Sequence, residues 1–63
     1  MEELGNKIRK AREKAGMTQE QLSREAGITV SSIFKIEKNK MSPSFELVKN
    51  IAKALNISLD SLI

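Results

Sequence analysis

The chain is divided at short intervals by residues that typically begin or end a helix. Gly16, Gly27 and Asn39 favour the left-handed backbone conformation in which many helices terminate. Thr18 and Thr29 carry side-chain oxygens that can accept hydrogen bonds from the free N–H groups of a first helical turn. These positions predict a series of short helices joined by short loops.

Between these boundaries, apolar residues recur at helical spacing. The first helix is expected to end at Gly16 and to bury the face formed by Leu4, Ile8, Ala11 and Ala15. A second helix is predicted from Gln19 to about Ala26, with Leu22 and Ala26 turned inward. Its first turn has the form of a capping box, in which Thr18 is the N-cap and Gln21 reaches back to it.

The last third of the chain predicts one strong helix and a final short turn. Ser42 and Pro43 are read as the N-cap and first residue of this helix, because a proline N–H is not needed there. The helix ends at Asn56, and its apolar stripe consists of Leu47, Val48, Ile51, Ala52 and Leu55. Ser58 then caps a turn that contains Leu59, Leu62 and Ile63.

The composition favours helices and excludes several kinds of site. Aromatic residues are only 3% of the 63 residues and there is one proline, so strands are disfavoured. We expect an all-α fold, a compact five-helix bundle that forms a single domain over residues 1–63. The absence of cysteine and histidine excludes disulfides, thiolate metal sites and an imidazole base. We therefore expect no enzyme activity, no metal and no cofactor.

Charge and hydropathy bear on location and partners. Without disulfides a secreted domain of this size would lack its usual support, so the chain is interpreted as cytoplasmic. The apolar runs are too short to span a membrane, and no small-molecule ligand is evident. Eleven Lys and Arg against eight Asp and Glu give a net charge of +3, which favours a polyanionic partner without proving one.

The segment Thr18–Asn39 contains two short helices separated by a turn. The turn includes Gly27 and Ile28, and Thr29 caps the helix that follows, which points Ile33 and Ile36 toward the core. Two helices joined by a short turn with glycine are typical of the helix-turn-helix unit, whose second helix enters the DNA major groove. Other helical corners share this spacing.

Several motifs in order carry a resemblance to a known family. They are Ile8–Arg12, Gly16–Leu22, Ala26–Thr29, Ile33–Asn39, Pro43-Ser44 and Ile51–Asp60. Together they resemble the helix-turn-helix domains of the phage Cro and repressor type, also called XRE-like, from Leu4 to Leu62. The chain departs from the family pattern at Asn39, where glycine is usual, and at Phe34, where a small polar residue is usual.

The resemblance implies five helices, of which the third is the recognition helix. It also implies a partly buried, structural ion pair between Arg12 and Glu37, although Glu37 taken alone would be a surface acid beside Lys38. For Gln19, at the start of the second helix, the resemblance implies contact with a DNA phosphate and a brace onto the recognition helix. The alternative for Gln19 is a good helix former in a first turn.

Recognition helices contact bases mainly through their N-terminal residues. The outward side of the third helix lies opposite its buried isoleucines. The candidates for base contacts on this side and at the start of the helix are Thr29, Val30, Ser31, Phe34 and Lys35. Lys35 can donate to guanine, Ser31 can pair with several bases, and Val30 can pack on a thymine methyl group. Val30 and Phe34 alternatively shield the core, and Phe34 alternatively meets a protein partner.

Phosphate contacts are expected on both sides of the recognition helix. The candidates are Gln19, Lys38, Lys40, Ser42 and Ser44. The basic residues between Lys7 and Lys14 are interpreted as a solvated helix face, apart from Arg12. Their number alone does not indicate a further contact with DNA.

These observations predict a sequence-specific, double-stranded DNA-binding protein that acts as a transcriptional regulator, with repression by occupying an operator. One domain buries only about 600–1,000 Å² on DNA, so we expect a homodimer on a two-fold symmetric operator. The candidate dimer surface is Ile57, Leu59, Leu62 and Ile63, and the alternative is that some of these residues belong to the core. The alternatives are an antitoxin-like protein-interaction module, a non-specific nucleic-acid binder, and a DNA-binding fragment of a larger regulator.

Overall fold

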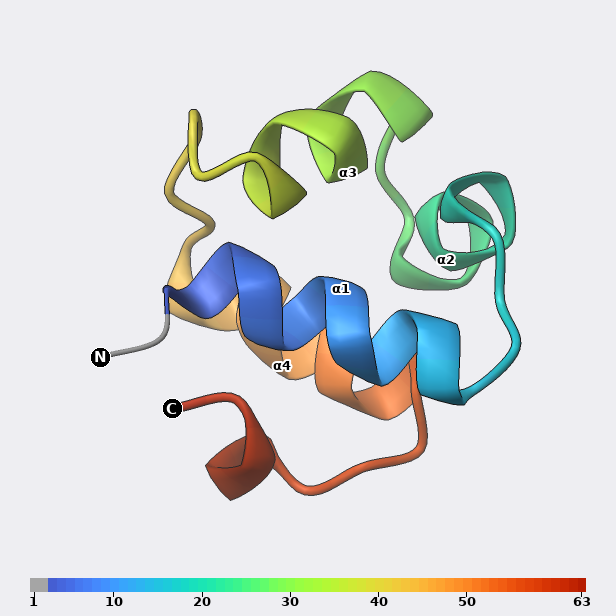
Figure 1. The fold of residues 1–63 in the computed structure, drawn as a ribbon, viewed down its shortest axis with the longest axis vertical. Coiled ribbons are helices and arrows are strands. Elements are labelled where there is room, and N and C mark those ends of the chain that lie inside the picture. The colour runs from blue at the N-terminus through green and yellow to red at the C-terminus, as the bar shows by residue number, and fades with distance from the viewer. Residues whose placement is uncertain (1–2) are drawn as a thin grey trace.

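The computed structural model describes residues 3–63, and every regular element in that range is helical. The elements are α1 (Leu4–Lys14), α2 (Gln19–Ala26), α3 (Val30–Glu37), α4 (Phe45–Ala54) and a short 3-10 helix, η1 (Leu59–Ser61). Figure 1 shows α3 at one end of the molecule and η1 at the other, with α1 in front of α4 between them. The all-α prediction is confirmed.

The expected number of helices is wrong, because the described residues contain four α-helices. The fifth element, η1, has only three residues. A segment that short closes hydrogen bonds between residues three apart, as in Ser61 N to the carbonyl of Ser58, and cannot complete an α-helical ladder. The last turn therefore forms where the sequence predicts it, but as a 3-10 turn.

Helix boundaries in the first two thirds of the chain follow the local capping residues. The capping box is present: Thr18 Oγ1 accepts from Gln21 N at 3.0 Å, and Gln21 Oε1 accepts from Thr18 N at 2.8 Å. Gly16, Gly27 and Asn39 all have left-handed backbone angles, with φ of 71°, 76° and 61°. Because α1 already ends at Lys14, Ala15 is its C-cap and is exposed rather than part of the buried face.

The start of α4 differs from the prediction. Its N-cap is Ser44, whose Oγ accepts a hydrogen bond from Leu47 N at 3.1 Å, and Pro43 precedes the cap instead of forming the first helical residue. Ser42 and Ser44 are both suitable caps and lie two residues apart. Local propensity therefore does not choose between them, and the predicted Ser42 cap is wrong.

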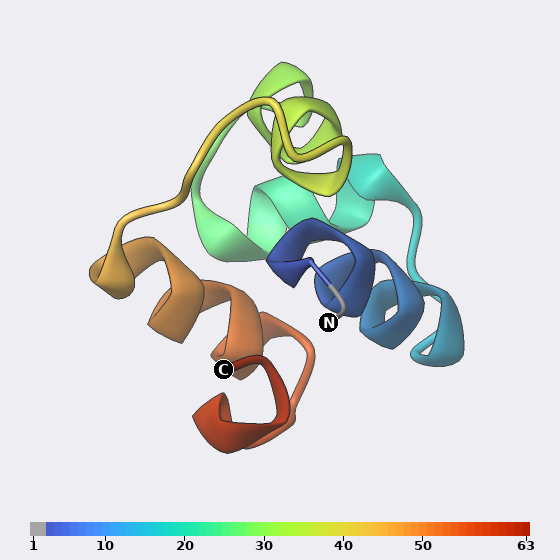
Figure 2. The same cartoon turned by 60° about the vertical axis from the view of Figure 1, so that its left-hand side comes forward.

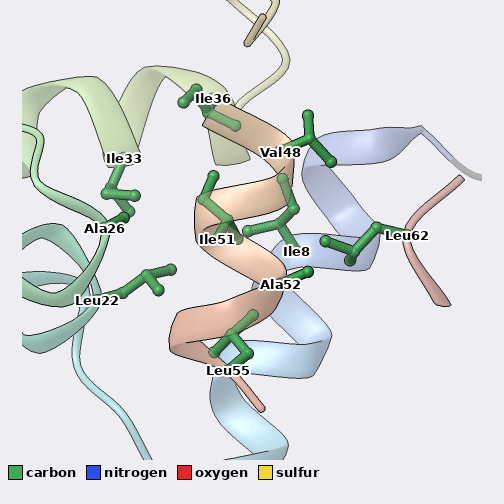
Figure 3. Close-up of a cluster of buried hydrophobic side chains, with 10 residues drawn as sticks. All are labelled: Ile8, Leu22, Ala26, Ile33, Ile36, Val48, Ile51, Ala52, Leu55 and Leu62. Atoms are coloured by element: carbon green, nitrogen blue, oxygen red, sulfur yellow. The ribbon is translucent and has the colours of Figure 1, made fainter. Parts of the chain in front are cut away.

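The core is formed where the four α-helices and the C-terminal turn meet (Figure 3). Its buried side chains are Ile8, Leu22, Ala26, Ile33, Ile36, Val48, Ile51, Ala52, Leu55 and Leu62. Leu62 is only 1% exposed, so it belongs to the core, which is one of the two alternatives that the sequence left open for the C-terminal apolar residues. Leu62 is the C-cap residue of η1, and its buried apolar side chain anchors that turn to the helices.

One close contact sets the spacing between α1 and α3. A side chain at Gly5 would meet the backbone carbonyl of Ile36, and the Oδ1 atom of Asn39 would be 2.6 Å from its Cβ. Instead, Gly5 N donates to Asn39 Oδ1 at 3.0 Å. Since Glu3, the N-cap of α1, makes no side-chain capping bond, Asn39 satisfies one of the free N–H groups of that helix from a distant part of the chain.

Two further features bear on function. No helix within residues 3–63 has both the length and the hydropathy needed to cross a membrane. The same residues contain no group of three His, Cys, Asp or Glu side chains that could bind a metal ion.

Candidate nucleic-acid interface

Helix α3 presents one side to the core and the other to solvent. Ile33 and Ile36 are buried, whereas the five predicted base-contacting residues are all exposed. Two of them are apolar: Val30 is 44% and Phe34 is 48% exposed. In Figure 2 this helix lies at the top of the molecule, away from α4 and η1, so its outer side is open to a large ligand.

Thr29 has a defined role before any contact with DNA. It is the N-cap of α3, and its Oγ1 accepts from Ser32 N at 3.1 Å and donates to Ser32 Oγ at 2.9 Å. These bonds hold the first turn of α3, next to Val30 and Ser31. A base contact by Thr29 would have to use the remaining capacity of this hydroxyl.

Phe34 and Lys38 interact on the exposed side of α3. The Nζ atom of Lys38 lies 5.7 Å from the centre of the Phe34 ring, a distance typical of a cation–π contact. Nearly half of the surface of Phe34 is exposed to solvent, and Phe34 does not belong to the buried core. The ring is therefore a surface feature of α3 with a cation held beside it.

Arg12 and Glu37, which the family resemblance pairs, form a two-point ion pair between α1 and α3. Arg12 Nε lies 2.7 Å from Glu37 Oε2, and Nη2 lies 3.1 Å from Oε1. The side chains are 12% and 3% exposed, so this pair is largely shielded from water. Arg12 Nη1 also donates to the backbone carbonyl of Met17 at 2.8 Å, in the loop that leads to α2.

Gln19 extends this network to α2. Its Nε2 atom donates to Glu37 Oε1 at 3.0 Å, so the carboxylate of Glu37 is shared by α1 and α2. The brace that the resemblance implies is therefore present. The hydrogen bond with Glu37 is also the main cause that raises the pKa of Arg12 above its usual value, so the guanidinium stays charged at every working pH.

The predicted phosphate-contacting residues follow α3 along the chain. Lys38, Lys40, Ser42 and Ser44 are all exposed and lie between the end of α3 and the start of α4. Ser44 has a structural task as well, because its hydroxyl caps α4. The four positions share one connecting segment, whereas Gln19 lies at the start of α2.

Sequence reasoning predicted the contact of Arg12 with Glu37 but not the contacts between Asn39 and the start of α1. Asn39 Nδ2 donates to Asn6 Oδ1 at 3.3 Å, beside the bond from Gly5 to Asn39. The one available signal was Gly5 itself, because a glycine in the first turn of a helix is unfavourable unless something approaches closely. Nothing local identified Asn39 as the group that approaches.

Comparison with known proteins assigns this arrangement of helices. A family model described as helix-turn-helix matches residues 8–62. The chain belongs to the helix-turn-helix family. An uncharacterized HTH-type transcriptional regulator of Archaeoglobus fulgidus is 39% identical over 59 residues, which cover 94% of this chain and 84% of that protein. The helix-turn-helix family is one of DNA-binding regulators, not of enzymes.

Solved structures agree with this assignment and with the phage repressor type. The DNA-binding domain of the P22 c2 repressor superposes with a TM-score of 0.93 at 30% identity, over 97% of this chain and 80% of that one. The P22 c2 repressor in complex with a synthetic operator gives a TM-score of 0.91 at 28% identity, over 100% and 96% of the two chains. These matches support DNA binding in transcription regulation as the function of this helix-turn-helix chain.

Proposed function

We propose that residues 1–63 act as one helix-turn-helix domain that binds an operator in double-stranded DNA and represses transcription from the cytoplasm. The observation that carries this proposal is the exposed outer side of α3, held in place by the Arg12–Glu37–Gln19 network. An α-helix fits the major groove, where each base pair presents a distinct pattern of donors, acceptors and methyl groups. Occupation of the operator would block polymerase sterically.

Specificity is assigned to the residues near the start of α3. Lys35 donates to guanine, Ser31 pairs with a base edge, and Val30 and Phe34 contact thymine methyl groups. Each good contact is worth about 1–3 kcal/mol of discrimination between bases. Exposure of both apolar side chains supports this role over core shielding, because Val30 and Phe34 leave nearly half of their surface open.

Phosphate contacts are assigned to Gln19, Lys38, Lys40, Ser42 and Ser44. Gln19 lies in the first turn of α2, where backbone N–H groups and the helix dipole favour an anion. Since its side-chain amide is bonded to Glu37, that residue also links phosphate contact to the position of α3. The proposal thus gives Gln19 a general effect on affinity, whereas Lys35 affects base preference.

A homodimer on DNA completes the proposal. Two α3 helices would meet half-sites about one helical turn apart. Ile63 is 65% exposed, and Ile57 and Leu59, six and four residues earlier in the chain, are partly exposed, so these three residues form the proposed dimer surface. Ile63→Asp should abolish cooperative binding to a two-site operator without weakening binding to a single half-site.

Selection from random duplex DNA, followed by binding to the enriched site, tests the proposal. An enriched, two-fold symmetric site is expected, with Lys35→Ala relaxing one position in each half-site. Lys53→Ala makes the same charge change on the exposed side of α4 and should leave the preference unchanged. Gln19→Ala should weaken binding to all sequences alike. Recovery of no preferred sequence would contradict operator recognition and favour non-specific binding or a protein partner.

A further inference from the structure

Helices α1 and α3 enclose a surface hollow of about 460 Å³ that opens beside the outer side of α3. Its lining includes Asn6, Arg9 and Arg12 on α1 and Phe34, Glu37 and Lys38 on α3 and its C-cap, together with Gln19 of α2 and Asn39. Phe34 and Lys38 belong to both the hollow and the exposed side of α3. A ligand lying along α3 would therefore also lie over this hollow.

The hollow carries a net positive charge. Three cations, Arg9, Arg12 and Lys38, and one carboxylate, Glu37, line it, which gives 3 − 1 = +2. The two-point ion pair uses the charge of Arg12 against that of Glu37. Arg9 and Lys38 remain, both exposed, and no ion pair among residues 3–63 involves either of them.

Two sets of hydrogen bonds hold the walls of the hollow on either side of Arg9. Toward the start of α1, Asn39 bonds to Gly5 N and to Asn6 Oδ1. Toward its end, Arg12 bonds to Glu37. Asn6, Arg9 and Arg12 follow one another at intervals of three residues, so they lie along one side of the helix. The spacing between α1 and α3 is thus set before a ligand binds.

Amide groups add neutral donors to the two cations. Asn6 Oδ1 accepts from Asn39 at 3.3 Å, which leaves the Nδ2 group of Asn6 to donate to a ligand. Guanidinium, ammonium and amide donors together match the oxygens of a phosphate, and the guanidinium can bind two of them at once. The chemistry of the hollow therefore suits a phosphate group rather than a base edge.

We propose that Arg9 and Asn6 of α1, together with Lys38, bind one backbone phosphate of the DNA that α3 contacts. This inference rests on the proposed DNA-binding function and adds α1 as a third contacting helix, after α2 and α3. It changes the role of Arg9 from a solvated surface charge to a phosphate ligand. Because a phosphate is the same in every sequence, this contact affects affinity and not base preference.

The test measures affinity for a labelled mixed-sequence duplex as a function of salt. Losing one phosphate contact makes the slope of log K against log salt shallower by about 0.9 for B-DNA. Arg9→Ala should show this change, and Arg9→Lys should retain the wild-type slope. Asn6→Ala should weaken binding without altering the slope, because the amide carries no charge.

Lys14→Ala is the matched control, since Lys14 is an exposed cation on α1 that does not line the hollow. It should leave the slope unchanged. Equal slopes for Arg9→Ala and Lys14→Ala would overturn the proposal. It would also be overturned if Arg9→Ala weakened the binding of inorganic phosphate but not the binding of duplex DNA. If the wild-type protein does not bind duplex DNA at all, the proposed function fails as well, which separates the two outcomes.

Discussion

Asn39 Oδ1 accepts a hydrogen bond from the backbone N–H of Gly5 at 3.0 Å, although the two residues are 34 positions apart in the chain. One side chain thereby caps the start of α1 from the end of α3. Asn39 also has a φ of 61°, which ends α3 in the left-handed conformation. A single asparagine thus combines a helix stop with a helix cap, and glycine could supply only the first.

Substitutions at Asn39 should separate these two roles. Asn39→Gly keeps the left-handed backbone and removes the cap, at an expected cost of about 1 kcal/mol of unfolding free energy. Asn39→Ala removes the cap and adds the strain of an L side chain at positive φ, about 1–2 kcal/mol more. Urea denaturation measures both values. Equal stability of the two variants would show that the backbone conformation at Asn39 is not strained.

Gly5→Ala should destabilise the protein, although alanine is the better helix former. In an open helix this change would stabilise by about 1 kcal/mol. Here the added methyl group meets the carbonyl of Ile36 and the side chain of Asn39, so we expect a loss of about 1–3 kcal/mol from overpacking. A thermal or urea unfolding curve gives the sign of the change in stability. A gain in stability would refute the close contact at Gly5.

Removing Arg12 from its ion pair with Glu37 should lower the unfolding free energy more than removing Glu37. Arg12→Met leaves a nearly buried carboxylate with Gln19 as its remaining partner, and we expect a loss of about 3–5 kcal/mol. Glu37→Leu should cost less, because Arg12 is the more exposed partner and keeps its bond to Met17. Chemical denaturation of both variants and of the double variant gives a mutant cycle. Strict additivity in that cycle would mean that the pair is not coupled.

The start of α4 can be located by removing one hydroxyl at a time. Ser44→Ala should lower the unfolding free energy by about 1 kcal/mol, because the N-cap bond to Leu47 is lost. Ser42→Ala, two residues earlier and on an exposed side chain, should change it by less than about 0.5 kcal/mol. Thermal melts of the two variants compare them directly. The reverse order would return the helix start to Ser42.

Leu62 and Ile63 are neighbours with opposite environments, so they test the position of the C-terminal turn. Leu62→Ala should cost about 2–5 kcal/mol, since it empties a site in the core. Ile63→Ala should change monomer stability by less than about 0.5 kcal/mol, because its side chain is exposed. Denaturation at low protein concentration keeps any dimer from contributing. Similar losses for both residues would contradict the burial pattern.

Much of the fold was predictable because its determinants are local. The capping box of Thr18 and Gln21 and the left-handed positions at Gly16 and Gly27 depend on hydrogen bonds and sterics within a few residues. The inward positions of Ile33 and Ile36 follow from helical periodicity alone. The outward side of α3, with Phe34 and Lys35, follows from the same periodicity, so the candidate base-contacting residues were found without the structure.

Where two local solutions have similar energies, the sequence alone could not choose. Ser42 and Ser44 are both suitable caps, and the structure shows that Ser44 is the one used. Leu62 and Ile63 are equally apolar, and the turn before them determines which one faces the core. The conformational preferences of single residues do not predict either choice.

The amino-acid sequence by itself determined where the helical segments lie, the capping box at the start of α2 and the exposed side of α3, because these depend on interactions between near neighbours. Only the tertiary structure decided which distant groups meet: Asn39 with Gly5, Gln19 with Glu37, and Arg9 with Lys38 around one hollow. The physical reason is that such contacts require loops to close and helices to pack at a given spacing, and no local hydrogen bond or periodicity encodes that spacing.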